Sequence, residues 1–216
     1  MNFHNILIFG DSYSTYAGHI PAGYAVYYSG KRETPPDLAD VSETWWHRLI
    51  TETGSNLVRN DSWSGSTICY TGYGNTDCSE TSSFICRFNK LRQAGFFREN
   101  KIDTVFVLGA TNDNWANSPV GELQFEGWDK KDLYSVLPAT CYFLSLLKEE
   151  FPHASIAFII NSGFKDSIRC GITEACRHYG IRAIQLVDID KVNGHPTSAG
   201  MEQIKNQVLS AMSDAN

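Results

Sequence analysis

The sequence predicts an α/β fold, a three-layer α/β/α sandwich around a five-stranded parallel sheet. Three observations lead to this prediction. Short, almost continuous apolar runs recur along the chain, segments with helical apolar spacing lie between them, and the longest loops follow the ends of the apolar runs. Strands that alternate with helices in this way form parallel sheets that helices cover on both faces.

Five apolar runs are predicted to be strands. Each is too short for a helix, and together they are rich in Val, Ile and Phe. Because strands of a covered parallel sheet are buried on both faces, they carry apolar residues at successive positions. The predicted strands are residues 6–9, 56–59, 104–108, 155–160 and 183–187.

Five segments between these runs are predicted to be helices, because apolar residues recur in them every three or four positions and form one buried stripe on each. They are residues 43–53, 83–100, 133–151, 166–179 and 197–212. Pro138 must start or kink its helix, because proline has no N–H to donate. We interpret the apolar stripes as core and not as cofactor-binding surfaces.

Composition and charge are those of an ordinary globular domain. The chain has 216 residues, a net charge of −6, 42% hydrophobic residues and 19% charged residues. At this length a single core buries roughly 70% of the surface of the unfolded chain, so folding needs neither a metal nor a disulfide. We therefore expect one domain over residues 1–216 and no cofactor. The acidic balance and the lack of any Lys or Arg run argue against a nucleic-acid partner.

Two expectations concern the compartment. No apolar stretch approaches the ~20 residues of a membrane span, and the N-terminal residues lack a basic region or a small-residue cleavage site. We expect no membrane span and a cytoplasmic location, with a secreted or periplasmic one as the alternative if a signal peptide has been trimmed. The six cysteines contain no CxxC pair and are expected to be free and mostly buried, with Cys69 and Cys78 the pair to test for a bridge.

The functional site is expected at one edge of the sheet. Three loops are long for such a fold, residues 13–42, 66–82 and 114–130, and each follows a predicted strand. The carboxyl ends of parallel strands are where open α/β sheets place their ligand sites.

Four residues that follow strands at this edge have the chemistry of acyl transfer. Ser12 follows the first strand within a Gly-Asp-Ser sequence, which alone is a common turn, Gly65 follows the second strand, Asn112 the third and His195 the fifth. A serine nucleophile needs a base within ~2.6–3.2 Å, and His195 is a candidate with an unperturbed pKa near ~6.5. The amides of Gly65, Ser12 and the Asn112 side chain could stabilise the oxyanion that forms.

These four segments, in this order, resemble the sequence blocks of the SGNH (GDSL-like) hydrolase family, from Gly10 to Gly200. The resemblance implies a flavodoxin-like sheet and metal-free hydrolysis of esters or thioesters by Ser12 and His195. One departure is the third block, which has one more residue before Asn112 than the usual Gly-x-Asn-Asp.

A second departure concerns the acid that orients the histidine. The family's acid normally stands three residues before His195, where this chain has Val192. Asp188 and Asp190 lie further upstream and would need a loop that folds back. Asn193, or a main-chain carbonyl of residues 191–194, could accept the Nδ1–H bond without a charge, and we favour this Ser–His dyad.

Aromatic residues near the predicted site suggest a pocket wall. Trp63 and Trp115 are predicted to bind substrate, because they neighbour Gly65 and Asn112. Five tyrosines lie in the first long loop, Tyr13, Tyr16, Tyr24, Tyr27 and Tyr28, and the alternative for all these aromatics is that they pack the loops onto the domain. Asp113 is interpreted as a structural hydrogen-bonding partner. Four histidines without a metal-ligand pattern, His4, His47, His153 and His178, are interpreted as surface or locally bonded residues.

The leading functional hypothesis is a serine esterase that acts on a small-molecule ester of a small acyl group, with an acetyl group on a sugar as the main candidate. Aromatic faces stack on sugars but also line acyl pockets, so thioesterase and lysophospholipase activities stay open. Noncatalytic carbohydrate binding is a further alternative, which the missing carboxylate at Val192 motivates.

Overall fold

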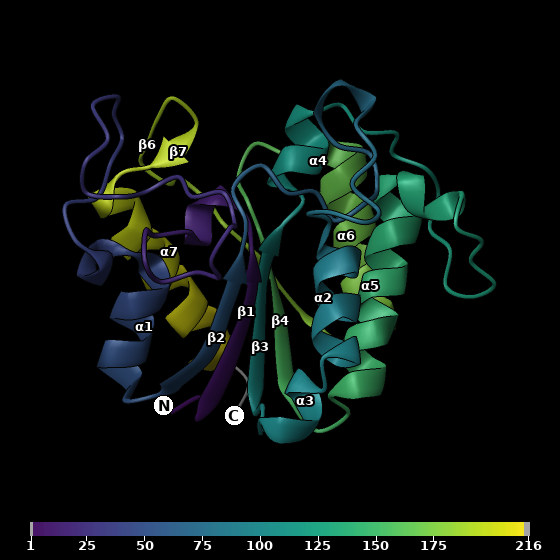
Figure 1. Ribbon diagram of the computed structural model, residues 1–216, viewed down its shortest axis with the longest axis horizontal. Helices are drawn as coiled ribbons and strands as arrows, with labels where there is room; N and C mark the ends of the chain where they lie inside the picture. Colours follow the sequence, from purple (N-terminus) through teal and green to yellow (C-terminus); the bar gives the residue numbers. More distant parts are fainter. Residues whose placement is uncertain (1, 214–216) are drawn as a thin grey trace.

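A computed structural model describes residues 2–213. Its centre is a sheet of five parallel strands in the order β2-β1-β3-β4-β5 (Figure 1). The strands are β1 (Asn5–Gly10), β2 (Asn56–Ser62), β3 (Thr104–Gly109), β4 (Ser155–Ile160) and β5 (Arg182–Gln185). The predicted three-layer fold with a flavodoxin-like sheet is therefore confirmed.

Helices cover both faces of this sheet (Figure 1). On one face α1 (Trp45–Thr53) packs against α7 (Ser198–Ser213), and the other face carries α2 (Phe84–Gln93), α5 (Val136–Glu150) and α6 (Asp166–His178). Thr44 caps α1 and Ser83 caps α2, each through a hydroxyl that accepts a backbone N–H bond. Pro138 lies in the first turn of α5, where its missing N–H costs nothing.

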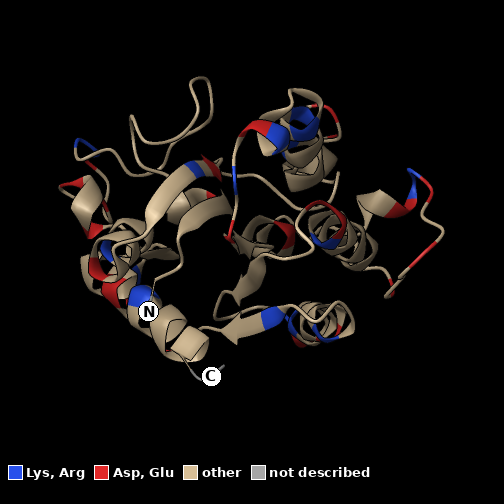
Figure 2. Ribbon diagram, turned by 90° about the horizontal axis from the view of Figure 1, so that it is seen from below, with Lys and Arg blue, Asp and Glu red and all other residues tan. Residues whose placement is uncertain are grey.

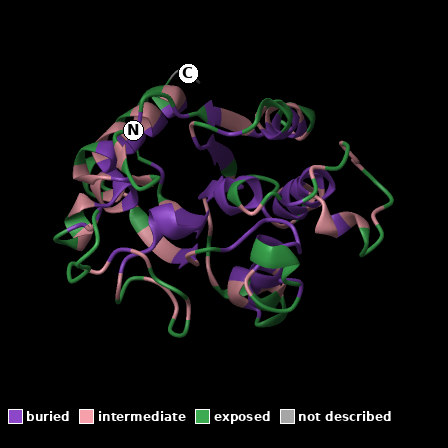
Figure 3. Ribbon diagram, turned by 90° about the horizontal axis from the view of Figure 1, so that it is seen from above, coloured by how far each residue is buried: buried purple, intermediate pink, exposed green. Residues whose placement is uncertain are grey.

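Successive strand residues point into two separate apolar layers. In β1, Leu7 and Phe9 pack with α2, α5 and α6, whereas Ile6 and Ile8 pack with α1 and α7. All six residues of β3 are buried. Figure 3 shows that buried residues gather at the centre of the molecule and that exposed residues lie mostly at its periphery. Burial on both faces explains why the strands read as continuous apolar runs.

Several boundaries differ from the prediction. The segment predicted as one helix at 83–100 forms α2 and α3 (Phe96–Glu99), because Gly95 has a left-handed φ of 77° that ends the first helix. A 3-10 turn, η4 (Asp132–Tyr134), precedes α5, and the fifth strand ends at Gln185 instead of residue 187. The sequence analysis also missed α4 (Thr111–Trp115) and a hairpin of β6 (Lys191–Val192) and β7 (His195–Pro196), which are too short to show a periodic pattern.

The strand order separates the loops at the predicted edge. The chain leaves β1 for α1 on one face of the sheet and leaves β3 for α5 on the other, so the loops diverge where these neighbouring strands end. Both α4 and the β6–β7 hairpin stand at this upper end in Figure 1. The site therefore forms between the ends of β1 and β3.

All six cysteines are free, so Cys69 and Cys78 are not bridged, and only Cys170 is exposed. Across residues 2–213, no helix is long and apolar enough to cross a bilayer, and no cluster of three or more His, Cys, Asp or Glu side chains could hold a metal ion. Acidic and basic residues are interspersed on the helices (Figure 2), and some form ion pairs between them, such as Arg92 with Glu150 at 2.7 Å.

Candidate active site

The hydroxyl of Ser12 and the imidazole of His195 lie together, although 183 residues separate them in the chain. Ser12 begins a 3-10 turn, η1 (Ser12–Ser14), directly after β1, and Asp11 caps this turn by accepting a bond from the Tyr13 N–H at 3.0 Å. The distance from Ser12 Oγ to His195 Nε2 is 3.1 Å. A serine proton can pass to a base at this distance.

Burial sets the protonation of His195. It lowers the pKa of the imidazole below 6.5, and the positive charges of Arg32 and Lys191 lower it further, whereas the bond to the Asn193 carbonyl raises it. A lowered pKa leaves the ring neutral at pH 7. This is the form that accepts a proton from Ser12.

A main-chain carbonyl, and no carboxylate, faces the other ring nitrogen of His195. The Asn193 oxygen lies 3.2 Å from Nδ1, and because a carbonyl only accepts, this contact places the ring proton on Nδ1. Within residues 2–213 no Asp or Glu hydrogen-bonds to the ring: the Asp190 carboxylate accepts from the Thr197 hydroxyl, and Asp188 is exposed. The geometry is that of a Ser–His dyad.

The hairpin that carries His195 is held by the first long loop. The Tyr13 hydroxyl donates to the Gly194 carbonyl, and the Tyr28 hydroxyl donates to the Pro196 carbonyl at 2.7 Å. The Asn193 side chain donates to the Pro35 carbonyl at 2.8 Å. These contacts fix the backbone on both sides of His195, so the ring has a rigid support without an acid.

The side-chain amide of Asn112 is fixed in one orientation. Asn112 lies in the first turn of α4, is buried, and donates from Nδ2 to the Ser66 carbonyl at 3.0 Å. Its Oδ1 accepts from the Tyr73 hydroxyl at 2.8 Å. The Ser66 carbonyl oxygen can only accept a hydrogen bond, so the atom of Asn112 that faces it must be the nitrogen and not the oxygen of the amide. The NH₂ group has a second hydrogen, which can bond to an oxyanion. Tyr73 is a site residue that the sequence analysis did not identify.

Two backbone amides complete the set of candidate oxyanion donors. Gly65 is exposed and has a φ of 82°, a conformation that glycine adopts without strain. In the described part of the chain, neither the Gly65 N–H nor the Ser12 N–H donates to a protein acceptor. Both are therefore available to a ligand.

The unusual third block has a specific local geometry. Ala110, between Gly109 and Asn112, adopts a left-handed φ of 69° and directly precedes α4. The carboxylate of Asp113 accepts from the Ile68 N–H at 2.9 Å and from the Cys69 N–H at 3.0 Å. Asp113 thus joins the end of β3 to the loop after β2, which agrees with its interpretation as a structural partner.

Asp11 is a buried carboxylate beside the nucleophile. It is fully buried, and within residues 2–213 its Oδ2 atom has no hydrogen-bond partner. Burial raises the pKa of Asp11 to about 7, and the nearby charge of Asp113 contributes in the same direction. Asp11 therefore titrates near neutral pH.

Arg87 of α2 connects the segments that carry the site. Its side chain and that of Asp61 are fully buried and form an ion pair at 2.8 Å. The same guanidinium donates to the Gly10 carbonyl at 3.1 Å and to the Ser66 hydroxyl at 3.3 Å. Arg87 was not among the predicted site residues, but the sequence held a signal for it: Arg87 falls within the apolar stripe of its helix, where a charged side chain needs a buried partner.

The two tryptophans occupy different sides of the site. Trp115 is 39% exposed, and its ring meets the His195 ring at 5.5 Å with an interplanar angle of 64°. Trp63 is half-buried and packs on Tyr24 with ring centroids 4.3 Å apart, two residues before Gly65. The structure thus places Trp115 against the histidine and Trp63 beside the candidate oxyanion glycine.

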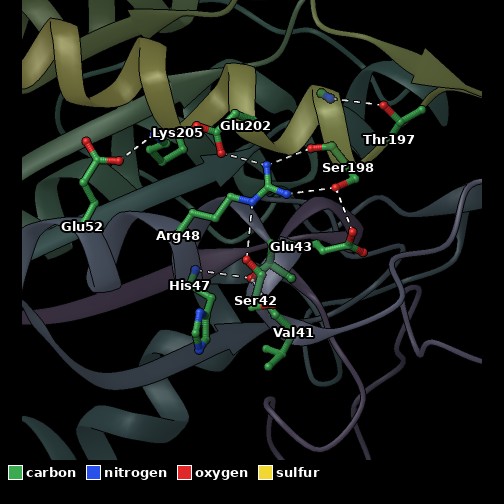
Figure 4. Close-up of polar contacts among 12 residues, drawn as sticks. Val41, Ser42, Glu43, His47, Arg48, Glu52, Thr197, Ser198, Glu202 and Lys205 are labelled. Carbon is green, nitrogen blue, oxygen red and sulfur yellow. Dashed lines mark hydrogen bonds and ion pairs between the residues drawn. The ribbon is translucent and has the colours of Figure 1, made fainter.

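An ionic network supports the helix that follows His195. Arg48 of α1 donates to the Ser198 carbonyl at 3.0 Å and pairs with Glu202 at 2.8 Å (Figure 4). Lys205 is buried and pairs with Glu52 at 2.6 Å and with Glu202 at 2.7 Å. The four charged residues of the network line a groove of about 320 Å³ between α1 and α7. Since the charges neutralise one another, the network serves to hold the start of α7.

Comparisons with known proteins identify the family of this chain. Residues 4–212 match the family model described as GDSL-like lipase/acylhydrolase. The crystal structure of a protein assigned as a GDSL-like lipase from Bacteroides ovatus ATCC 8483 has a TM-score of 0.91 and 41% identity, over 98% of this chain and 99% of that one. The corresponding protein from Bacteroides uniformis ATCC 8492 has a TM-score of 0.89 and 44% identity, over 98% and 96%.

More distant structures share the fold alone. An acetyl xylan esterase from the rumen bacterium Butyrivibrio proteoclasticus has a TM-score of 0.61 and 16% identity, over 98% of this chain and 63% of that one. A search among curated proteins gave no significant match. The family model spans nearly the whole sequence, and the chain belongs to the GDSL-like lipase/acylhydrolase family.

Proposed function

We propose that this protein is a serine esterase that removes a small acyl group, foremost acetyl, from a carbohydrate ester. The observation that carries the proposal is the 3.1 Å contact between Ser12 Oγ and His195 Nε2. A neutral histidine, a serine at the end of a strand and unoccupied amide donors are the parts that acyl transfer needs.

In the first half of the reaction, Ser12 Oγ attacks the ester carbonyl carbon and its proton passes to His195 Nε2. The carbonyl oxygen becomes an oxyanion, which the amides of Gly65, Ser12 and Asn112 stabilise. When the tetrahedral intermediate collapses, the bond to the alcohol breaks, and His195 returns the proton to the leaving oxygen. The product is an acyl ester on Ser12.

In the second half, water attacks the acyl carbon and gives a proton to His195 Nε2. Collapse of the second intermediate breaks the bond to Ser12 Oγ and returns the proton to it, which releases the carboxylic acid. The Asn193 carbonyl accepts the Nδ1–H bond in both halves and keeps the ring in the productive tautomer.

The position of His195 also assigns the two sides of the candidate site. Because His195 Nε2 protonates the leaving alcohol, that alcohol lies beside the histidine and therefore beside Trp115. Trp115 is exposed and presents an aromatic surface that suits a sugar ring. Trp63 lies on the loop with Gly65, so it borders the acyl and oxyanion side.

A substrate screen tests the proposal. p-Nitrophenyl esters of increasing chain length and acetylated sugars are offered to the wild type and to Ser12→Ala. We expect release of short acyl groups, with acetyl foremost, by the wild type alone. A preference for long acyl chains or thioesters would indicate the lysophospholipase or thioesterase alternative, and equal turnover by both proteins would refute esterase activity.

Noncatalytic carbohydrate binding makes a different prediction. It requires saturable sugar binding together with no reaction of Ser12 toward a fluorophosphonate probe. The short distance between Ser12 and His195 favours catalysis, and covalent labelling of Ser12 would exclude this alternative.

A further inference from the structure

We propose that Tyr27 is a positioning residue for His195. It holds the imidazole ring in its working plane and stabilises the imidazolium that forms when Ser12 gives up its proton. This inference rests on the proposed Ser–His reaction and explains how the site functions without a carboxylate beside the histidine.

The geometry of the two rings carries the inference. The Tyr27 and His195 rings are stacked, with centroids 3.6 Å apart and an interplanar angle of 8°. Trp115 and Tyr13 meet the same imidazole at 5.5 Å and 5.6 Å, tilted by 64° and 52°. A rotation of the imidazole would drive its edge into Tyr27. The ring therefore stays in the plane in which Nδ1 faces Asn193 and Nε2 faces Ser12.

The electronic effect has a defined direction. The face of a phenol ring is negative, so it attracts an imidazolium more strongly than a neutral imidazole. His195 is neutral in the resting enzyme and positive in the transition state. Tyr27 therefore stabilises the transition state more than the bound substrate, and its loss must lower kcat more than it changes KM.

Arg32 holds Tyr27 from the opposite side. Its guanidinium carbon lies 4.1 Å from the centre of the Tyr27 ring, and two groups at these distances cannot share one face of the ring. Tyr27 is thus sandwiched between Arg32 and His195. Together with burial, the charges of Arg32 and Lys191 lower the pKa of His195 and so oppose the imidazolium. Their effect is weakened because Arg32 is exposed to water and because Lys191 is bonded to Asn161 at 2.7 Å and to Ser162 at 2.8 Å.

The hydroxyl of Tyr27 takes no part in positioning His195. Among residues 2–213 it makes no hydrogen bond, in contrast to Tyr13 and Tyr28, whose hydroxyls bond to the hairpin backbone. A phenylalanine at position 27 therefore preserves the stacked face, whereas a leucine removes it and keeps an apolar side chain of similar reach.

The kinetic test compares Tyr27→Leu with Tyr27→Phe on the acetyl ester that the wild type turns over. We expect kcat of Tyr27→Leu to fall by roughly 3- to 30-fold, the range of a partly desolvated cation–π contact, with KM changed less than about twofold. Tyr27→Phe should stay close to the wild type. The matched control is Phe125→Leu, which removes a similar stack on His178, with centroids 3.9 Å apart at 15°, and should leave kcat unchanged.

A spectroscopic readout separates this inference from the proposed activity. The ¹⁵N chemical shifts of His195 report which ring nitrogen carries the proton, even if no ester is hydrolysed. The wild type and Tyr27→Phe should show the proton on Nδ1, and Tyr27→Leu should show averaging of the two tautomers. Unchanged shifts and kcat in Tyr27→Leu would overturn the inference, as would an equal loss of kcat in Tyr27→Phe.

Discussion

Replacing Asp190 by Asn tests directly whether a carboxylate orients His195. Removal of the acid of a Ser-His-Asp triad can cost ~10⁴ in kcat. In this structure the Asp190 carboxylate bonds to the Thr197 hydroxyl and does not reach the imidazole, whose Nδ1 faces the Asn193 carbonyl at 3.2 Å. Asn keeps the size of the side chain and one oxygen that can accept from Thr197. We therefore expect kcat of Asp190→Asn to fall by less than about tenfold, far short of the triad effect.

The assay is steady-state hydrolysis of an acetyl ester by a set of matched variants. Asp188→Asn is the control for removal of an exposed charge near the hairpin and should also lose less than about tenfold, whereas His195→Ala should abolish turnover. Circular dichroism verifies that each variant is folded. A loss of a thousandfold or more in Asp190→Asn with a native spectrum would overturn the dyad and restore a triad with a displaced acid.

Three further predictions concern the oxyanion donor, a buried acid and a buried ion pair. Asn112→Ala should lower kcat by roughly 10²–10³ with little change in KM, because its donor acts on charge that develops in the transition state; a change within about threefold would exclude Asn112 as a donor. The pKa of Asp11 is about 7 in the folded protein and ~3.9 in the unfolded chain, so between pH 5 and 8 only the folded state loses this proton as the pH rises. Wild-type stability should therefore fall by about 3 kcal/mol more than that of Asp11→Asn over this range in urea titrations, and parallel curves would contradict the raised pKa. Arg87→Met leaves the fully buried Asp61 with the partly exposed Arg59, at 2.9 Å, as its remaining ion-pair partner. It should cost about 3 kcal/mol of unfolding free energy, the low end for a broken buried pair, and a cost below about 1 kcal/mol is the contrary result.

The sheet could be predicted because burial on both faces leaves a clear pattern. Four of the five predicted strands lie inside the observed ones, since a covered parallel strand must be apolar at successive positions. Helix ends were less predictable. Gly95 splits the segment at 83–100 through a single left-handed residue, and a glycine alone does not distinguish a helix end from a tolerated position inside a helix.

The site residues could be predicted where their side-chain type is distinctive. They could not be predicted where their role depends on the local backbone conformation. Ser12 follows β1, Asn112 follows β3, and His195 lies in the segment after β5, so the topology of the parallel sheet places them at one edge. The partner of His195 Nδ1 is a backbone carbonyl, which every residue carries, so no residue type could single it out. The stacking of Tyr27 depends on how a long loop folds back, and the cluster of tyrosines in that loop was the only sequence signal for it.

The central claim is that Ser12 is a nucleophile activated by His195, and covalent labelling tests it most directly. Intact-protein mass spectrometry follows the reaction of a fluorophosphonate probe with the wild type, Ser12→Ala and His195→Ala. We expect one adduct on Ser12 in the wild type and none in Ser12→Ala. In His195→Ala the labelling rate should be at least about 10³-fold below that of the wild type, because the serine then lacks its base. An unlabelled wild type, or labelling that persists in Ser12→Ala, would contradict this claim.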